Sequence, residues 1–278
     1  MPKLNNCVEF LQWALPRLGR RWEGYRKVKK QVCQRIRERM EKHGLKGHEQ
    51  YRQFLESNPE EWALLDEMMR ISISRFFRDY KSWELLKEKL LPQLVLKASE
   101  ENRPVNCWSA GCASGEEPYS LAILWKYEIA TDFPEAELQL IATDLDDHLL
   151  ERANRACYTK GNLKYVPEKW LQECFEKQKR EYCLKPSVKN MVEFKKQDIR
   201  QEMPPGKFDL VFCKNVVGMY FEKDKAAAIY RNIIERMHPG GYLFSGNHEP
   251  VPLEELPWLE EYNRGLNVYR KKAERSSL

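Results

Sequence analysis

Three groups of residues that could bind a ligand come directly after strand-like runs of the sequence. A loop bounded by glycines, residues 111–115, follows the first run, Asp144 ends the second, and Asn215 comes shortly after the third. Glycines let a backbone approach a ligand closely, and an aspartate at a strand end can accept hydrogen bonds from ribose hydroxyls. Because ligands bind beyond the carboxyl ends of parallel strands, these positions predict a nucleotide-type site.

Two acidic residues after the loop indicate the kind of ligand. The loop matches neither the G-x-G-x-x-G nor the G-x-x-x-x-G-K-[ST] pattern, and the helix after it opens with Glu116 and Glu117. Two carboxylates would repel a pyrophosphate but suit the sulfonium, ammonium and ribose groups of S-adenosylmethionine. This favours S-adenosylmethionine over NAD or ATP. The alternative is that both glutamates only complement the helix dipole, and their spacing leaves this open.

The elements that must position these residues alternate between strand and helix. The predicted strands cover residues 105–110, 137–144, 208–213 and 242–245, and the predicted helices cover 116–130, 146–156 and 223–237, with a turn at 238–241. This alternation predicts an α/β fold with a doubly wound, mostly parallel sheet and helices on both faces. Residues 158–191 are polar and interrupt the pattern, so we expect an inserted subdomain there, with a weak strand at 182–184.

The first 90 residues have a helical pattern instead. Apolar residues recur at intervals of three and four from Tyr25 to Met40, and Gly44 is expected to end that helix. A shorter helix is expected from residue 83, with Ser82 as its N-cap. We therefore expect a small all-helical domain with a linker at 1–90, and a catalytic domain that binds S-adenosylmethionine at 91–278.

The loop region resembles the signature of a known family. Residues 108–120, WSAGCASGEEPYS, are similar to the signature of the CheR family, S-adenosylmethionine-dependent methyltransferases that esterify glutamates on chemotaxis receptors. Three further blocks follow the family's order: SISRFFRD at 72–79, ATDLD at 142–146 and FDLVFCKN at 208–215. The likeness extends over most of the chain and implies a Rossmann-like class I methyltransferase with an N-terminal helical domain.

The resemblance also implies roles for individual residues. It implies catalytic roles for Arg78 and Tyr220 and cofactor contacts for Ser72, Ser74, Arg78, Gly111, Glu117, Asp144, Asp198, Ile199, Lys214 and Asn215. Among these, Asp144 is the ribose-binding acid, and Asp198 and Ile199 lie beside the adenine. The expected cofactor is S-adenosylmethionine, with S-adenosylhomocysteine as product, and no metal is expected.

The chemistry of glutamate esterification agrees with these roles. A glutamate side chain is already ionised at neutral pH, so the enzyme needs no general base and must mainly hold the carboxylate in line with the methyl group. Arg78 is the candidate that grips the carboxylate, although it could instead seal the domain interface together with Phe76 and Phe77. Tyr220 is expected near the methyl group, or it is simply a buried tyrosine at the end of an apolar run.

The sequence departs from the family pattern at several places. Ser72 and Ser74 replace the family's asparagine and threonine, and four residues separate Asn215 from Tyr220 where the family usually has three. Residues 246–249, GNHE, stand near the family's G-H-S-E with the histidine shifted by one. The insertion is shorter than the family's β-subdomain, which docks a receptor pentapeptide in some members, so we do not assign that docking here.

The charge is unevenly distributed. The chain carries a net +5, but residues 17–42 hold eleven Lys and Arg against three Glu. This basic helix is a solvated face, a docking surface for an acidic helical partner, or a nucleic-acid site. The resemblance favours an acidic helical protein such as a chemotaxis receptor, and no nucleic-acid partner is expected because no binding motif is recognised.

Cysteine spacing and hydropathy bear on the location of the protein. Eight cysteines form no C-x-x-C pair and five histidines form no H-x-x-x-H, so neither zinc ligation nor a disulfide framework is indicated. Scattered reduced thiols are typical of a cytoplasmic protein, which is the expected location. No apolar run is long enough to cross a bilayer, and no signal peptide is expected at the N-terminus, so membrane insertion is not expected.

Three functions remain open at this point. The leading hypothesis is a CheR-type protein-glutamate O-methyltransferase. The second is a CheR-like methyltransferase acting on another protein or on a small molecule. The third is a non-catalytic module that binds S-adenosylmethionine.

Overall fold

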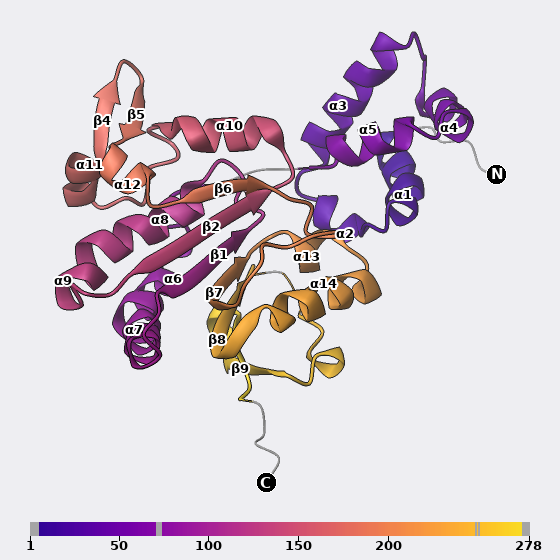
Figure 1. Ribbon diagram of the computed structural model, residues 1–278. Coiled ribbons are helices and arrows are strands. Elements are labelled where there is room, and N and C mark those ends of the chain that lie inside the picture. Colours follow the sequence, from indigo (N-terminus) through magenta and orange to yellow (C-terminus); the bar gives the residue numbers. More distant parts are fainter. Residues whose placement is uncertain (1–5, 71–73, 248, 250, 274–278) are drawn as a thin grey trace.

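A seven-stranded sheet forms the centre of the structure, a computed structural model that describes residues 6–70, 74–247, 249 and 251–273 (Figure 1). Its order is β6-β2-β1-β7-β8-β10-β9, parallel from β6 to β8, with β10 and β9 antiparallel. The strands are β1 (Val105–Ala110), β2 (Leu138–Asp144), β6 (Glu193–Lys196), β7 (Phe208–Cys213), β8 (Met237–Ser245), β9 (Leu259–Asn263) and β10 (Val268–Lys271). This order confirms the predicted doubly wound, mostly parallel α/β fold.

Helices cover both faces of the sheet and explain its apolar strands. Every residue of β7 is buried, as expected for a central parallel strand. The helices of this part of the chain are α6 (Tyr80–Leu85), η1 (Leu86–Leu90), α7 (Leu91–Glu100), α8 (Glu116–Leu124), η2 (Trp125–Ile129), α9 (Ala130–Asp132), α10 (Asp147–Arg155), α13 (Val217–Tyr220) and α14 (Lys223–Glu235). Two short turns, η3 (Leu253–Glu255) and η4 (Arg264–Leu266), flank β9 in the chain. The predicted turn at 238–241 is part of β8, where the pairing with β7 shifts register between Phe208 and Leu210.

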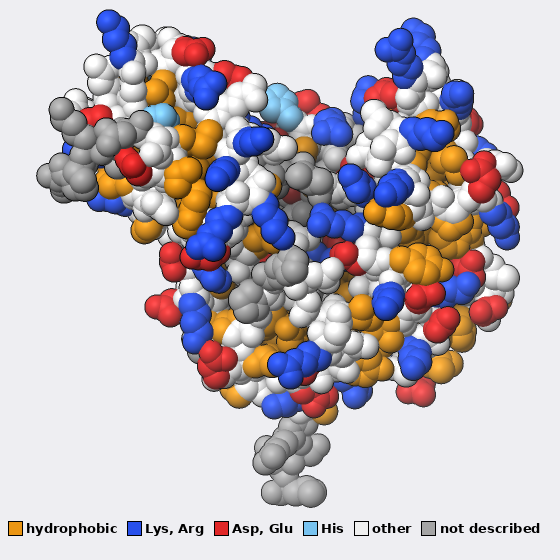
Figure 2. Space-filling model, turned by 180° about the vertical axis from the view of Figure 1, so that it is seen from behind, with side chains coloured by type: hydrophobic (Ala, Val, Ile, Leu, Met, Phe, Trp, Pro, Cys, Tyr) orange, Lys and Arg blue, Asp and Glu red, His pale blue; other side chains and the backbone are white. Residues whose placement is uncertain are grey.

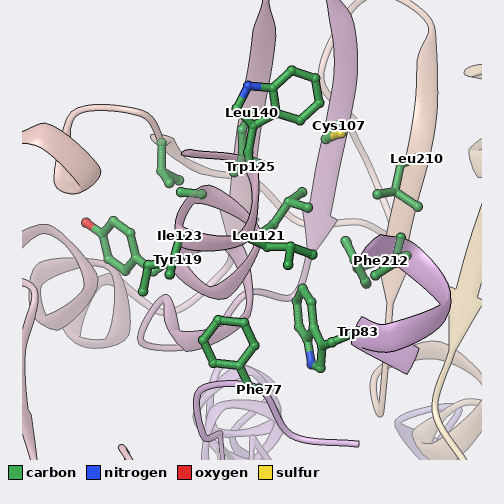
Figure 3. Packing of buried hydrophobic residues seen from close by; sticks show 14 of the residues in the cluster. Phe77, Trp83, Cys107, Tyr119, Leu121, Ile123, Trp125, Leu140, Leu210 and Phe212 are labelled. Carbon is green, nitrogen blue, oxygen red and sulfur yellow. The ribbon is translucent and has the colours of Figure 1, made fainter. Parts of the chain in front are cut away.

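The segment after the helical domain packs into the core of the sheet. Phe77 and Trp83 stack edge to face with ring centroids 5.4 Å apart, and Trp83 stacks on Phe212 of β7 at 5.6 Å (Figure 3). The expected N-cap at Ser82 is wrong, because α6 begins at Tyr80 and Ser82 lies buried within it. Trp83 packs against Phe212 of the sheet, so the turn that contains it is helical and Ser82 is buried as well. The helix therefore begins earlier than the serine, a typical N-cap residue, indicates.

The helical domain stands to one side of the sheet and has its own core (Figure 1). It consists of α1 (Cys7–Arg17), α2 (Trp22–Tyr25), α3 (Lys29–Lys42), α4 (His48–Ser57) and α5 (Glu61–Met68). Gly44 follows α3 with φ +66°, as expected for the residue that ends a helix. The expectation of one basic helix over 17–42 is wrong, because the chain turns at Gly19 and continues as an extended segment at Arg20, which forms a bridge with Phe221 of the catalytic domain.

The insertion forms a separate three-stranded sheet, β3-β5-β4, as expected for an inserted subdomain. Its elements are β3 (Cys157–Thr159), α11 (Glu168–Cys174), β4 (Phe175–Gln178), β5 (Glu181–Leu184) and α12 (Pro186–Lys189). The predicted weak strand is β5, the central strand of this sheet.

The cysteines contradict the expectation of reduced thiols throughout. Disulfides join Cys7 to Cys33 and Cys157 to Cys183, and the remaining four cysteines are buried thiols. The second pair lies opposite one another on β3 and β5, and the first joins α1 to α3. Each pair is 26 residues apart, so only the fold brings the sulfurs together. Within the described residues, no helix combines the length and the apolar character that a bilayer crossing requires.

Candidate active site

A cavity of about 770 Å³ lies between the helical domain and the carboxyl ends of β1, β2 and β7. It is lined by every predicted site residue that the structure describes, namely Ser74, Arg78, Gly111, Glu117, Asp144, Asp198, Ile199, Lys214, Asn215 and Tyr220. Ser72, the remaining predicted residue, lies outside the described residues. The fold therefore brings together residues that are up to 146 positions apart in the sequence, from Ser74 to Tyr220.

The glycine loop after β1 forms one wall of this cavity. Gly111 has φ +71°, and a Cβ atom there would lie 2.4 Å from Cγ2 of Val216. Glycine at this position therefore allows the loop to contact the segment after β7. The N–H groups of Gly111 and Cys112 both donate to the Thr143 carbonyl, which fixes the loop to the end of β2.

Asp144 extends from the end of β2 into the cavity. Its Oδ2 accepts a hydrogen bond from the Ala113 N–H at 2.8 Å, and its Oδ1 accepts one from the Asp146 N–H at 3.0 Å. Each carboxylate oxygen can accept a further bond, so the group remains able to bind a diol. Burial raises the pKa of Asp144 above its usual 3.8, and the backbone N–H groups oppose this shift.

The two glutamates that open α8 have separate surroundings. Glu117 lines the cavity and accepts a hydrogen bond from the Ser109 hydroxyl at 2.8 Å; burial raises its pKa, and the Lys214 ammonium opposes the shift. Glu116 is buried and accepts bonds from the side chains of Ser114, Asn162 and Ser74. Glu116 thus joins the loop, the insertion and the segment before α6, while Glu117 is available to a ligand.

A chain of ion pairs borders the cavity on the side of Asp198. The backbone N–H, Nε and Nη2 of Arg200 all donate to the Asp198 carboxylate. Its Nη1 donates to Asp66 of α5 at 2.9 Å, and Asp66 also accepts from Arg20 at 2.7 Å. Burial alone would raise the pKa values of Asp66 and Asp198, but their arginine partners lower both below the usual 3.8. This network joins the helical domain to the loop after β6.

Lys214 is held beside the cavity by an acid from the segment before α6. Its ammonium lies 3.0 Å from Asp79 Oδ2, and Asn247 donates to Asp79 Oδ1 at 3.1 Å. Arg78, the neighbour of Asp79, is exposed along the cavity, and its carbonyl accepts a bond from the Trp83 indole at 2.8 Å. Phe77 is buried in the core of the sheet domain, whereas its neighbour Arg78 lines the cavity.

Tyr220 lies where the helical domain meets the loop after β7. Its ring is 5.1 Å from that of Tyr25, and its carbonyl accepts a hydrogen bond from the Arg21 N–H at 2.8 Å. A Cβ atom on Gly24 would lie 2.4 Å from the Met219 carbonyl oxygen. The four-residue segment before Tyr220 is therefore accommodated by a glycine of the helical domain. Burial raises the pKa of Tyr220 above its usual 10.0.

Basic side chains surround the part of the cavity formed by the helical domain. The cationic lining residues outside the predicted set are Arg20, Arg21, Arg26, Lys27, Arg70, Arg75 and Arg200, and Glu23 is the acidic one. Figure 2 shows Lys and Arg side chains gathered in the middle of this face, between the helical lobe and the remainder of the molecule. The cavity therefore combines acids at the strand ends with a basic opening.

Comparisons with known proteins agree with this geometry. The family model described as the S-adenosylmethionine-binding domain of CheR methyltransferase matches residues 72–264, and the all-alpha domain of the same family matches residues 27–69. The chain belongs to the CheR methyltransferase family. It is an S-adenosylmethionine-dependent methyltransferase, which confirms the prediction from the residues at 108–120.

Several curated relatives are similar to this CheR-family chain over most of their length. A chemotaxis protein methyltransferase of Borreliella burgdorferi is 31% identical over 75% of this chain and 75% of its own. One from Listeria monocytogenes is 31% identical over 68% and 70%, respectively. Chemotaxis protein methyltransferase 1 of Pseudomonas aeruginosa is 35% identical over 71% and 73%.

The donor set of this methyltransferase fits S-adenosylmethionine. Asp144 has free acceptor capacity for ribose hydroxyls, Glu117 offers a carboxylate to a cation, and Ile199 supplies an apolar wall. Acids rather than a phosphate-binding loop therefore face the ligand. Among the described residues, no group of three His, Cys, Asp or Glu side chains is arranged to hold a metal ion.

The sequence did not indicate three features of this site. Arg200 binds the carboxylate of Asp198, two positions before it in the sequence. The D-x-R spacing is the local sequence signal that could have indicated this ion pair. Gly24 contacts the catalytic domain, and nothing in its sequence neighbourhood indicates this. Glu249 bonds to the backbone of the loop after β7, although only the position of its neighbouring histidine drew attention in the sequence.

Proposed function

We propose that the methyl acceptor is a glutamate side-chain carboxylate of a chemotaxis receptor, and that the products are a glutamate methyl ester and S-adenosylhomocysteine. The observation that carries this proposal is Arg78, an exposed arginine on the same cavity as Asp144 and Glu117. A guanidinium binds a carboxylate in a fixed orientation. The relatives are named chemotaxis protein methyltransferases, which supports the same substrate class.

The proposed mechanism is one of positioning. The cofactor supplies an electrophilic methyl group when bound. A glutamate carboxylate is ionised at neutral pH and attacks without a general base. Arg78 orients this carboxylate, and Tyr220, held between Tyr25 and the loop after β7, packs beside the reacting groups and excludes water.

The remaining site residues are proposed to hold the cofactor. Asp144 binds the ribose hydroxyls, Glu117 the amino group, and Asp198 and Ile199 the adenine. Ser72, Ser74, Gly111, Lys214 and Asn215 complete the proposed set of contacts, and no metal takes part. Ser74 also bonds to Glu116, so its contribution is proposed to come through the position of its backbone.

The proposed docking surface for an acidic helical partner is the exposed part of residues 17–42. Several of its arginines bond within the protein: Arg20 pairs with Asp66, Arg39 pairs with Glu61, and Arg35 donates to carbonyls at the end of α5 and just after it. Arg17 and Arg21 donate to backbone carbonyls as well. The exposed cations are Arg17, Arg26, Lys27, Lys29, Lys30, Arg35, Arg37 and Lys42, of which Arg26 and Lys27 line the cavity. Charge complementarity with a glutamate-rich helical bundle would orient the substrate. No nucleic-acid partner is proposed.

The domain division and location remain proposals as well. We propose a helical domain with linker at 1–90, a catalytic domain at 91–278 with the insertion at 158–191, and a cytoplasmic location. Disulfides are uncommon in the cytoplasm, where glutathione keeps thiols reduced. The oxidation state of Cys7, Cys33, Cys157 and Cys183 in cells, measured by alkylation and mass spectrometry, tests the location. Fully reduced thiols agree with it, and fully oxidised pairs contradict it.

The acceptor chemistry is tested with S-adenosylmethionine labelled on its methyl group and membranes that contain chemotaxis receptors. Label that mild alkali releases as methanol supports a carboxyl ester. Label that resists alkali contradicts the glutamate acceptor and favours transfer to another group. Cofactor binding with no transfer to any protein favours a binding module.

A further inference from the structure

Glu249, just after β8, has a buried carboxylate, and the hydrogen bonds described for this carboxylate all come from backbone N–H groups. Its side chain is almost inaccessible, with 2% of the residue exposed. Oε2 accepts from the N–H groups of Asn215 at 2.5 Å and Gly246 at 2.7 Å. Oε1 accepts from those of Val216 at 2.7 Å and Met219 at 3.3 Å. One carboxylate thus binds four donors.

Three of the four donors belong to residues 215–219, the catalytic loop between β7 and Tyr220. Asn215 has φ +60°, a left-handed conformation that asparagine tolerates better than most residues. Val216 precedes α13, whose first N–H groups have no acceptor within the helix. The carboxylate of Glu249 satisfies donors on both sides of this bend and so fixes its shape.

Gly246 makes this approach possible. A Cβ atom at position 246 would lie 2.6 Å from Glu249 Oε2 and 2.7 Å from Asn215 Oδ1. Both atoms would have to move if any other residue stood there. The segment that follows β8 therefore supplies both the anion and the space in which the anion meets the catalytic loop.

The second side of the catalytic loop is held by the helical domain. Gly24 contacts the Met219 carbonyl, and the Arg21 N–H donates to the Tyr220 carbonyl. Glu249 holds the opposite side, toward the sheet. Burial of a carboxylate is costly, and burial raises the pKa of Glu249 although its four N–H partners oppose the shift. The buried carboxylate is useful here because a smaller or apolar side chain would leave these four backbone N–H groups without an acceptor.

We propose that Glu249 is a positioning residue for methyl transfer, which fixes the catalytic loop so that Asn215 and Tyr220 face the cavity. This rests on the proposed roles of those two residues. Glu249 itself is not among the residues that line the cavity. Its effect is transmitted through the backbone at positions 215, 216 and 219.

The test compares Glu249→Gln with Asp209→Asn. Glutamine keeps the size of the side chain but presents an NH₂ group to two of the four donors. Asp209 is a matched control, because it is also buried, with 1% of the residue exposed, and its carboxylate is held by Arg103 and the Asn106 N–H near the opposite end of β7. For both variants, amide hydrogen exchange of residues 215–219, binding of S-adenosylhomocysteine and the turnover number are measured.

In Glu249→Gln we expect the amides of Asn215, Val216 and Met219 to exchange about tenfold faster or more, and kcat to fall about 10- to 100-fold. Asp209→Asn should lower the melting temperature but change neither the exchange of these three amides nor kcat. Unchanged exchange and unchanged kcat in Glu249→Gln overturn the proposal, as does an equal loss of kcat in Asp209→Asn.

Exchange in the wild-type protein decides the matter if Glu249→Gln does not fold. Protection of the three amides comparable to that of β7 supports the proposal, and exchange at the rate of an exposed loop overturns it. The exchange measurement needs no methyl acceptor. If wild-type protein does not methylate receptors, the proposed acceptor fails, and the role of Glu249 is still tested by exchange.

Discussion

Arg200 and Asp66 form an ion pair between the loop after β6 and helix α5, with Nη1 and Oδ2 2.9 Å apart. Arg200 also clamps Asp198 at the cavity, and Asp66 also binds the buried Arg20. The helical domain and the proposed adenine side of the cavity are therefore joined through one aspartate. A substitution at Asp66 should therefore affect both the packing of the helical domain and the proposed adenine side of the cavity.

Asp66→Asn should destabilise the protein by about 3 kcal/mol, because it leaves two arginines with partly uncompensated charge in a buried setting. Urea unfolding measures this loss. The matched control is Asp147→Asn, since Asp147 pairs with Lys196 where both side chains are more than half exposed. That control should change stability by less than about 0.5 kcal/mol. Equal effects of the two substitutions would show that the network does not stabilise the domain contact.

Gly24→Ala should slow turnover about tenfold or more, because the new methyl group meets the Met219 carbonyl and displaces Tyr220. Steady-state kinetics on receptor membranes measures this effect. Gly47→Ala is the control, because Gly47 has extended backbone and no atom within 4 Å of the added Cβ. Normal turnover in Gly24→Ala would mean that the contact between α2 and the catalytic loop is dispensable.

Affinity for S-adenosylhomocysteine should fall as the pH is lowered. Burial raises the pKa of Asp144 above 3.8 and that of Glu117 above 4.5, and both are proposed to bind the ligand as carboxylates. Protonation therefore weakens binding as the pH falls through these raised values. The free energy of unfolding changes in the opposite direction. A raised pKa means that the folded protein binds the proton more tightly than the unfolded chain does, so these two groups favour folding more at lower pH.

Titration calorimetry from neutral pH down to pH 4.5 measures this dependence, with far-ultraviolet circular dichroism as the check that the fold persists. Asp144→Asn removes one of the two titrating groups and should show weaker binding with a shallower pH dependence. A constant affinity over this range in the wild-type protein would contradict the proposed ligand contacts.

Arg78→Ala should reduce kcat/KM about 10- to 100-fold, the expected effect of losing a charge-assisted bond to the substrate carboxylate. The melting temperature should stay close to that of Lys81→Ala, an exposed neighbour that is not among the lining residues of the cavity. Arg78→Lys should recover only part of the activity, because an ammonium lacks the planar fork of a guanidinium. A large loss of stability with normal activity would assign Arg78 to the domain interface instead.

The sequence predicted the features that depend on local pattern. The buried run of β7, the glycine loop and the acid at the end of β2 each follow from apolar periodicity and from residues at strand ends. Together with the family resemblance, they predict a ligand site beyond the carboxyl ends of the strands, and the described residues of that predicted site line one cavity.

Features that depend on distant contacts were not predictable in this way. The break of the basic segment at residues 19–21 results from the bridge between Arg20 and Phe221, 201 positions away. The start of α6 before Ser82 follows from the burial of Trp83 against Phe212. The pairing of Cys7 with Cys33 depends on how α1 packs against α3. No periodicity within one segment contains this information.

Alkali-labile methyl label decides whether this cavity transfers a methyl group from S-adenosylmethionine to a glutamate carboxylate. Wild-type protein and Asp144→Ala are incubated with methyl-labelled S-adenosylmethionine and receptor-containing membranes, and the methanol released by mild alkali is counted. Base-labile label is expected with the wild-type protein and none with the variant, which should no longer bind S-adenosylhomocysteine. Label that survives alkali would contradict a glutamate acceptor, and equal transfer by Asp144→Ala would contradict the proposed cofactor site.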